Sequence, residues 1–287
     1  MSTDNAYYVP HNAKWPIIGS IGLTLFLAGF AGQLNGSSMA SNVMTAGLLV
    51  LIYMLFGWFG EVIDESESGA YSRVENASFR IGMVWFIFSE VMFFAAFFGA
   101  LYYIRVFSVP WLGGVGSGSL SHEFIWNDYT AVWPTNGPES IGGDYKKMSA
   151  WGLPSINTLI LLSSGFTVTL AHWGLVANKR KQLIFGLAAT VTLGFLFVVL
   201  QAVEYGHGYH ELNLTMGSGI YGSTFYLLTG FHGFHVTVGA IMLSVILVRS
   251  LKGHFTAENH FAFEAAAWYW HFVDVVWLGL FVFVYWL

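Results

Sequence analysis

The sequence contains no cysteine and very little charge, and both absences narrow the range of possible functions. Without cysteine the chain can form no disulfide, no thiolate metal site and no cysteine nucleophile. Only 9% of its 287 residues are charged, whereas a soluble globular protein carries roughly 25%, so it cannot cover itself with a hydrated surface. The N-terminal stretch MSTDNAYYVPHNAKWP lacks the apolar core of a signal peptide, and we expect no cleaved signal there. The main solvent of this chain is therefore expected to be lipid.

Hydrophobic residues make up 55% of the sequence and gather in long runs. A membrane-spanning helix needs about 20 predominantly apolar residues. Seven runs meet this length, at residues 15–34, 43–63, 79–105, 153–176, 183–205, 223–248 and 261–287. We therefore predict an all-α membrane protein with seven transmembrane helices.

Lysine and arginine predict the orientation of these helices, because both residues concentrate on the cytoplasmic side of a membrane. A cytoplasmic N-terminus puts eight cations on the inner side: Lys14, Arg73, Arg80, Lys179, Arg180, Lys181, Arg249 and Lys252. The outer side then holds only three, Arg105, Lys146 and Lys147. We predict a cytoplasmic N-terminus and a C-terminus on the outer side.

The segment 106–151 is too long for a tight turn, and we interpret it as a long outer loop. It opens with GGVGSGS, a composition typical of flexible linkers, and continues with several tryptophans and tyrosines, which favour the membrane interface. We expect it to lie across a partner surface or lipid headgroups. The chain is accordingly divided into an N-terminal segment, 1–78, with the first two helices, and a five-helix bundle, 79–287.

Five ionisable residues are expected at similar depth in the membrane: Glu90, His232, His235, His271 and Asp274. A charge at the bilayer centre costs about 2.5–3.5 kcal/mol on insertion scales, so such residues usually face the interior of a bundle. We expect these five side chains to point toward one another.

The residues alone are compatible with four functions for these polar groups. The two histidines of the sixth run could bind a metal with Glu90 or Asp274, but nothing matches the paired Glu-x-x-His set of a di-iron bundle. A single Glu-x-x-His, Glu204–His207, has no twin. Haem binding is weaker still, and a self-contained pump lacks broken helices and a repeat. Hydrogen bonding between helices is the simpler interpretation.

The fourth function is assembly and lipid binding. Small residues spaced four apart, such as Ala95 and Gly99, let helices approach closely. The run LPSINTLILLSSGFTVTLAH is too rich in serine, threonine and asparagine to face lipid, so we expect it to pack on protein. The cations Arg80, Arg249 and Lys252 lie at headgroup depth, where they fit anionic lipid binding and topology determination equally well.

Several motifs closely resemble subunit III of cytochrome c oxidase, in the haem–copper oxidase superfamily. They are HFAFEAAAWYWHFVDVVWLGLFVFVYW, YGSTFYLLTGFHGFHVTVG, FIFSEVMFF, LPSINTLILLSSG with LAHWGL, and LQAVEY. The resemblance covers nearly the whole chain, and the loop 106–151 matches least well.

The resemblance implies a seven-helix subunit without a redox centre, whose first two helices splay from the other five around a V-shaped cleft filled by phospholipids. It implies contact mainly with subunit I and also with subunit II, where haem a and copper reduce oxygen with electrons from cytochrome c. It further implies a bacterial or mitochondrial inner membrane, and it leaves membership of a larger respiratory supercomplex open. The expected role is to stabilise subunit I, to support proton uptake and sustained turnover, and to aid oxygen entry. No nucleic acid is expected as a partner.

Residue by residue, the resemblance assigns Glu90 to the family's membrane-embedded, carbodiimide-reactive glutamate. It implies a lipid role for two groups, the first being Trp58, Glu65 and Arg80 and the second Arg249, Lys252 and His254. No catalytic residue and no metal ligand are expected in this chain. Asp64, where some relatives carry arginine, weakens the expectation of a doubly anionic lipid beside Glu65.

Two alternatives stay open. The third subunit of a quinol oxidase usually lacks the first two helices, and residues 15–63 supply both here, which favours the cytochrome c enzyme. An independent membrane transporter or metalloenzyme would instead show activity or bound metal in the isolated chain.

For Glu90 we expect a neutral acid that bridges to a polar group on the sixth or seventh run, with His232 as the first candidate. A structural hydrogen bond is the simpler role for this acid. The sharper role is control of proton or oxygen access to subunit I.

Overall fold

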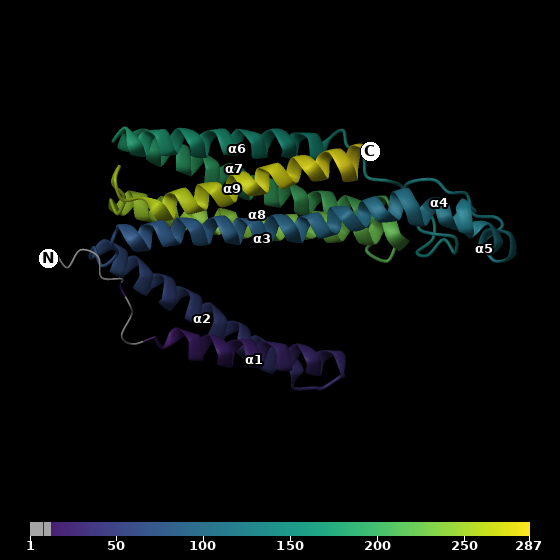
Figure 1. Cartoon of the computed structure of the whole chain (residues 1–287), viewed down its shortest axis with the longest axis horizontal. Coiled ribbons are helices and arrows are strands. Elements are labelled where there is room, and N and C mark those ends of the chain that lie inside the picture. Colours follow the sequence, from purple (N-terminus) through teal and green to yellow (C-terminus); the bar gives the residue numbers. More distant parts are fainter. Residues whose placement is uncertain (1–7, 9–12) are drawn as a thin grey trace. The chain divides into compact units, whose positions relative to one another are not determined.

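The computed structural model describes residue 8 and residues 13–287 of the chain. Within these residues seven helices are long and apolar enough to cross a membrane, as predicted. The long helices are α1 Trp15–Leu34, α2 Ala40–Glu67, α3 Arg73–Tyr103, α6 Leu153–Val176, α7 Arg180–Glu211, α8 Gly219–Lys252 and α9 Phe261–Leu280 (Figure 1). A π-helical stretch, Phe281–Trp286, continues α9 to the last residue but one.

The chain forms two compact units, Met1–Ile81 and Gly82–Leu287, and α3 runs through the boundary between them. In the first unit α1 and α2 pack as an antiparallel pair joined by a short turn. Glycine permits this pairing, because a Cβ on Gly47 would lie 2.3 Å from the Phe26 backbone nitrogen, and one on Gly29 equally close to that of Met44. The two backbones touch at these positions, so no side chain fits between them.

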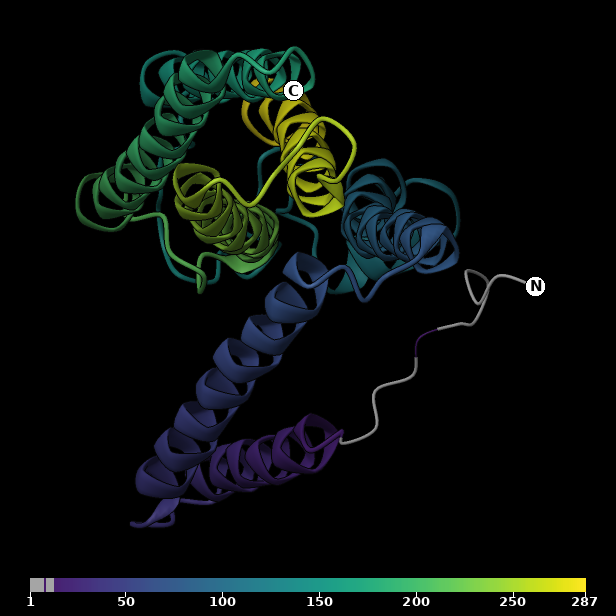
Figure 2. The same cartoon turned by 90° about the vertical axis from the view of Figure 1, so that its left-hand side faces the viewer.

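In the second unit α6, α7, α8 and α9 form a closed ring of contacts, in which each helix packs on two of the others (Figure 2). Trp270 of α9 is fully buried in this ring. Its ring lies against Gly194 of α7 and Gly239 of α8, and its Nε1–H donates to Ser164 Oγ of α6 at 2.9 Å. A buried indole needs a hydrogen-bond acceptor, and the serine supplies it. One side chain thus contacts all three neighbouring helices.

The helix α6 packs on protein, as its polar composition predicts. Asn157 and Ser164 are fully buried, and Thr158 Oγ1 accepts a hydrogen bond from Trp277 Nε1 at 2.9 Å. Ser164 and Thr158 of this helix therefore serve as acceptors for Trp270 and Trp277 of α9.

The segment after α3 differs from the prediction. The third span does not end at residue 105 but continues through a π-helical turn, Ile104–Ser108, into α4, Val109–Leu112. The expected flexible linker at 113–119 folds back onto α4, since Val115 N donates to Pro110 O and Trp111 Nε1 donates to Ser117 Oγ. A 3₁₀ turn, Gly116–Gly118, and a short helix α5, Ser119–Phe124, follow. Local hydrogen bonds therefore fold this glycine-rich stretch, although its composition is typical of a flexible linker.

The second half of the loop 106–151 lies on the chain's own helices. Tyr145 stacks on Tyr221 at the start of α8, with ring centroids 5.6 Å apart, and Trp133 meets the same ring edge-on. Lys146 N donates to Leu212 O at 2.9 Å. The tyrosine and tryptophan that suggested an interface position are thus used for packing within the chain.

Candidate functional site

The buried polar residues do not converge on one centre. Glu90 of α3 pairs with His235 of α8, whose Nε2 lies 2.9 Å from Glu90 Oε2. His232, expected as the first partner of Glu90, instead lies with its Nε2 3.2 Å from the Val273 carbonyl oxygen of α9. The two histidines are three residues apart on one helix, and they face different neighbours.

The Glu90–His235 pair shares one proton. The Nδ1–H of His235 donates to the Phe231 carbonyl oxygen at 2.6 Å, since a carbonyl oxygen can only accept. One further proton between Nε2 and Glu90 Oε2 completes the second bond. The pair is therefore electrically neutral overall, whether that proton belongs to the carboxyl group or to the imidazole.

Aromatic rings surround this pair and limit its hydration. The His235 ring has its centroid 5.0 Å from that of Phe94 and lies within 20° of parallel to the ring of Tyr269. The side chains of His235 and Glu90 are 8% and 23% exposed, respectively. A net-neutral pair suits such a place, because an isolated charge would be costly in a weakly polar environment.

His232 joins two helices in the core. It is fully buried between Phe197 of α7 and Trp277 of α9, and its Nε2–H donates to the Val273 carbonyl. Its Nδ1 finds no donor within the described part of the chain. The arrangement fits a hydrogen bond between helices, the simpler interpretation of this residue.

His271 and Asp274 form a separate contact on the side of α9 that faces α6. His271 Nδ1 lies 3.6 Å from Asp274 Oδ2, and His271 Nε2 lies 3.3 Å from Thr169 Oγ1. A Cβ on Gly165 would lie 2.3 Å from Asp274 Oδ2, so the carboxylate rests on a bare stretch of α6. These two residues lie one turn apart on the face of α9 toward α6, so they do not point toward Glu90 as expected.

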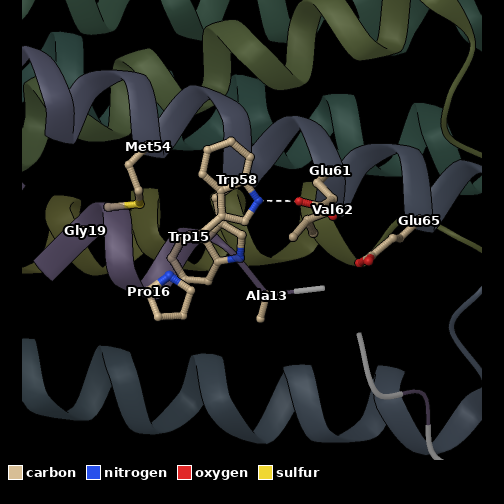
Figure 3. Close-up of a pocket in the computed structure, with 9 residues that line it drawn as sticks. All are labelled: Ala13, Trp15, Pro16, Gly19, Met54, Trp58, Glu61, Val62 and Glu65. Atoms are coloured by element: carbon tan, nitrogen blue, oxygen red, sulfur yellow. Dashed lines mark hydrogen bonds between the residues drawn. The ribbon is translucent and has the colours of Figure 1, made fainter. Parts of the chain in front are cut away.

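The residues assigned to lipid fall into two places, one in each unit. In the first unit, Trp58 and Glu65 help to line a pocket of about 250 Å³ between α1 and α2 (Figure 3). Trp15 also lines it and donates its Nε1–H to Glu61. Glu65 accepts hydrogen bonds from the hydroxyls of Tyr71 and Tyr8. Arg80 lies half-buried in the early part of α3.

The hydrogen bonds from Tyr8 and Tyr71 to Glu65 raise the pKa of each phenol. The hydrogen bond to Glu65 raises the pKa of Tyr8, and burial together with the same bond raises the pKa of Tyr71. Both phenols therefore stay neutral donors at physiological pH. Each oxygen of the Glu65 carboxylate accepts a hydrogen bond from one of these tyrosines.

In the second unit, Arg249, Lys252 and His254 lie at and just after the end of α8. The Arg249 guanidinium lies over the ring of Phe255, 4.6 Å from its centroid, and the residue as a whole is 7% exposed. Lys252 is exposed. His254 N donates to the Arg249 carbonyl at 3.1 Å. The exposed lysine is thus the cation of this group best placed to meet an anion.

Two polar contacts between distant segments were missed from the sequence. Glu204, considered only as part of a Glu-x-x-His motif, accepts a 2.6 Å hydrogen bond from Tyr285 in the core, while His207 pairs with Glu211 at 3.0 Å. Arg180 Nη2 donates to the Ser250 carbonyl at 2.6 Å, at the C-terminal end of α8. A cation at this end of a helix is favourable because unpaired carbonyls point there. Nothing in the local sequence signals either partner.

The comparisons with known proteins cover nearly the whole chain. The family model described as Cytochrome c oxidase subunit III matches residues 5–119 and 126–287. A protein named Cytochrome c oxidase subunit 3 from Carassius auratus is 40% identical over 283 residues, which is 98% of this chain and 97% of the relative. Proteins of the same name from Arabidopsis thaliana and Marchantia polymorpha are each 39% identical, over 99% and 100% of this chain and 97% and 98% of theirs. Between the two matched stretches, the unmatched residues 120–125 fall in α5 and the residue after it.

Proposed function

The chain belongs to the cytochrome c oxidase subunit III family, and from this premise we propose that it is a non-catalytic subunit of the oxidase. In this role it stabilises subunit I, holds structural phospholipids and supports proton uptake and sustained turnover. The relatives are named for cytochrome c oxidase, so a quinol oxidase or an independent transporter is not favoured.

The poor burial of α1, α2 and α3 carries this proposal. In the most apolar 18-residue stretch of each helix, the chain itself buries only 11% of the residues in α1 and 6% in α2. The same share is 6% in the span that starts with α3. Apolar faces of this length need lipid or another protein around them. Subunit I is the proposed main protein partner and subunit II a second one, with haem a and copper in those partners and cytochrome c as the electron donor.

Lipid completes the proposed surroundings. A phospholipid-filled, V-shaped cleft between the first two helices and the other five belongs to this proposal, as do a cytoplasmic N-terminus and an inner membrane. The pocket beside Trp58 and Glu65 suits the start of an acyl chain, because its wall combines indole and aliphatic surface. Lys252 offers an exposed cation for a headgroup at the end of α8.

Glu90 and His235 support the proton-related part of the role. Their shared proton can move between Oε2 and Nε2 without placing a net charge among the surrounding aromatic rings. We propose that this pair primarily joins α3 to α8. Its sharper role, control of proton or oxygen access to subunit I, needs an independent test.

The first experiment is purification of the tagged chain from native membranes in a mild detergent, with a reduced-minus-oxidised spectrum and metal analysis. We expect haem a and copper to accompany the chain and to leave when its partners are removed. A chromophore that stays with the isolated chain would overturn the proposal.

The second experiment tests the role of Glu90 in turnover. If the pair also controls proton or oxygen access, Glu90→Gln oxidase should assemble but inactivate sooner during sustained turnover, with slower proton uptake. Thr169→Val, which alters a contact on the opposite side of α9, is the control. Unchanged turnover lifetime and proton uptake in Glu90→Gln would reduce the pair to a structural contact.

A further inference from the structure

Three potential metal ligands meet at the end of the bundle where α6 ends and α9 begins. His172 lies one turn before the end of α6, His260 directly precedes α9, and Glu264 is in the first turn of α9. Their ligand atoms all lie within 4.8 Å of one another. None of these residues belongs to the groups assigned above to proton or lipid roles.

Two of the three distances in this cluster, both from His260, fit a bound ion better than they fit hydrogen bonds. His260 Nε2 lies 3.4 Å from His172 Nε2 and 3.4 Å from Glu264 Oε1. Both distances exceed the usual range of about 2.7–3.2 Å for a hydrogen bond from nitrogen. Two ligands about 2.05 Å from a tetrahedral zinc ion lie about 3.3 Å apart, which matches both distances.

The backbone fixes the tautomer that a metal requires. The Nδ1–H of His260 donates to the Thr256 carbonyl oxygen at 3.0 Å, so the lone pair of the neutral ring is on Nε2, the atom that faces the cluster. Metal-binding histidines commonly donate their second ring N–H to a carbonyl or carboxylate in this way. The turn that presents this carbonyl is itself held, because Asn259 N donates to Thr256 Oγ1.

The second histidine is also positioned by its surroundings. The His172 ring lies nearly parallel to that of Phe263, with centroids 5.4 Å apart and an interplanar angle of 28°. His260 and Glu264 side chains are only 9% and 13% exposed. The cluster is therefore restrained and partly shielded, yet accessible enough for an ion to enter.

We propose that His172, His260 and Glu264 form a binding site for a divalent transition-metal ion, with Zn²⁺ as the best match. Two imidazoles and one carboxylate are an established zinc ligand set, and water would complete a tetrahedral shell. The ion would tie the end of α6 to the beginning of α9, two elements joined here by side chains 88 residues apart. The expected function is to stabilise this end of the bundle.

The test uses the assembled oxidase purified in detergent, stripped with EDTA and titrated with Zn²⁺ alone. Bound zinc is measured by mass spectrometry after gel filtration, and haem a absorbance confirms assembly before each titration. We expect the intact oxidase to bind one zinc more tightly than the variants His172→Ala and Glu264→Gln, by about 100-fold or more, since even the loss of a supporting group costs 10–100-fold.

The matched control is His207→Ala. His207 and Glu211 are also a histidine–glutamate pair four residues apart on a helix, 3.0 Å from each other, without a second histidine assigned to them. Its zinc affinity should equal that of the unmodified oxidase. X-ray absorption at the zinc edge should give two imidazole nitrogens at about 2.0–2.1 Å.

Equal zinc binding in the unmodified oxidase, His172→Ala and Glu264→Gln would overturn the site, as would a zinc spectrum without imidazole ligands. Glu264→Gln keeps the shape of the side chain, so the test does not depend on the more disruptive alanine variant. Failure of the zinc site leaves haem a and turnover intact and is thereby distinct from failure of the proposed subunit function.

Discussion

The α1–α2 pair and the α6–α9 ring are both built from long apolar helices, yet the chain buries them very differently. In the most apolar 18-residue stretch of each helix, the chain buries 11% of the residues in α1 and 6% in α2. The corresponding shares are 39% in α6, 33% in α7, 39% in α8 and 56% in α9. The pair is held by contact of two backbones at Gly29 and Gly47, whereas the ring is held by buried tryptophans with hydrogen-bond acceptors. In lipid, an apolar side chain alone does not decide which helices associate; small residues and paired polar groups do.

The largest expected effect concerns the ring. Trp270→Ala should destabilise the second unit by about 3–5 kcal/mol, because it removes a fully buried indole that contacts three helices. Thermal unfolding of the purified oxidase measures this loss. Trp85→Ala, at a tryptophan that is 66% exposed on α3, should change stability far less. Equal effects of the two variants would contradict the assigned core.

A second variant breaks the pair by steric overlap. Gly47→Leu should separate α1 from α2 at a cost of about 1–3 kcal/mol or more, because its Cβ would overlap the Phe26 backbone. Since the chain has no cysteine, cross-linking between cysteines engineered into α1 and α2 reports their distance without background. The control is Gly60→Leu in the same helix, where a Cβ meets nothing within 4 Å. Efficient cross-linking in Gly47→Leu would refute the close approach.

A double-mutant cycle sharpens the comparison within the second unit. Leucine substitutions at Glu90 and His235, singly and together, should give a coupling energy of about 1–2 kcal/mol, as expected for a buried hydrogen bond. The same cycle at His271 and Asp274 should give less than about 0.5 kcal/mol, because the 3.6 Å contact is long and His271 is half-exposed. Detergent-induced unfolding measures both cycles, and the reverse order would show that the pairs were ranked wrongly.

The smallest expected effect lies in the loop. Burial raises the pKa of Tyr145 to about 12 from an ordinary value near 10. The folded state therefore holds this proton more tightly, and the resulting stability is fully present below pH 10 and is lost between about pH 10 and 12. The difference in ultraviolet absorbance between the unmodified protein and Tyr145→Phe follows the titration. Ionisation near pH 10 would show that the loop does not cover this ring.

The sequence predicted the membrane class and the seven spans well, because hydropathy and length decide them. It also predicted that α6 packs on protein, from the serine, threonine and asparagine that lipid would leave unpaired. The linker at 113–119 was predicted wrongly, because composition does not reveal that Trp111 and Ser117 bond across the turn. Local polarity is readable from a sequence, whereas the closing of a particular turn is not.

The partner of Glu90 could not be chosen from the sequence for a geometric reason. His232 and His235 are three residues apart and so point only about 60° apart around α8. A modest rotation of the helix decides which of them meets α3, and that rotation follows from the packing of the whole ring. The cluster of His172, His260 and Glu264 was missed for a related reason, since it unites residues from two distant segments.

The one proton shared between Glu90 Oε2 and His235 Nε2 also determines how this pair responds to membrane voltage. A full elementary charge crossing the membrane changes energy by about 2.3 kcal/mol per 100 mV. Between Oε2 and Nε2 the proton travels less than the 2.9 Å that separates them, at most about a tenth of the roughly 30 Å hydrocarbon thickness. The electric field thus performs at most about 0.2 kcal/mol of work per 100 mV on this transfer, well below thermal energy. Respiring and de-energised membranes should therefore hold the pair in nearly the same protonation state.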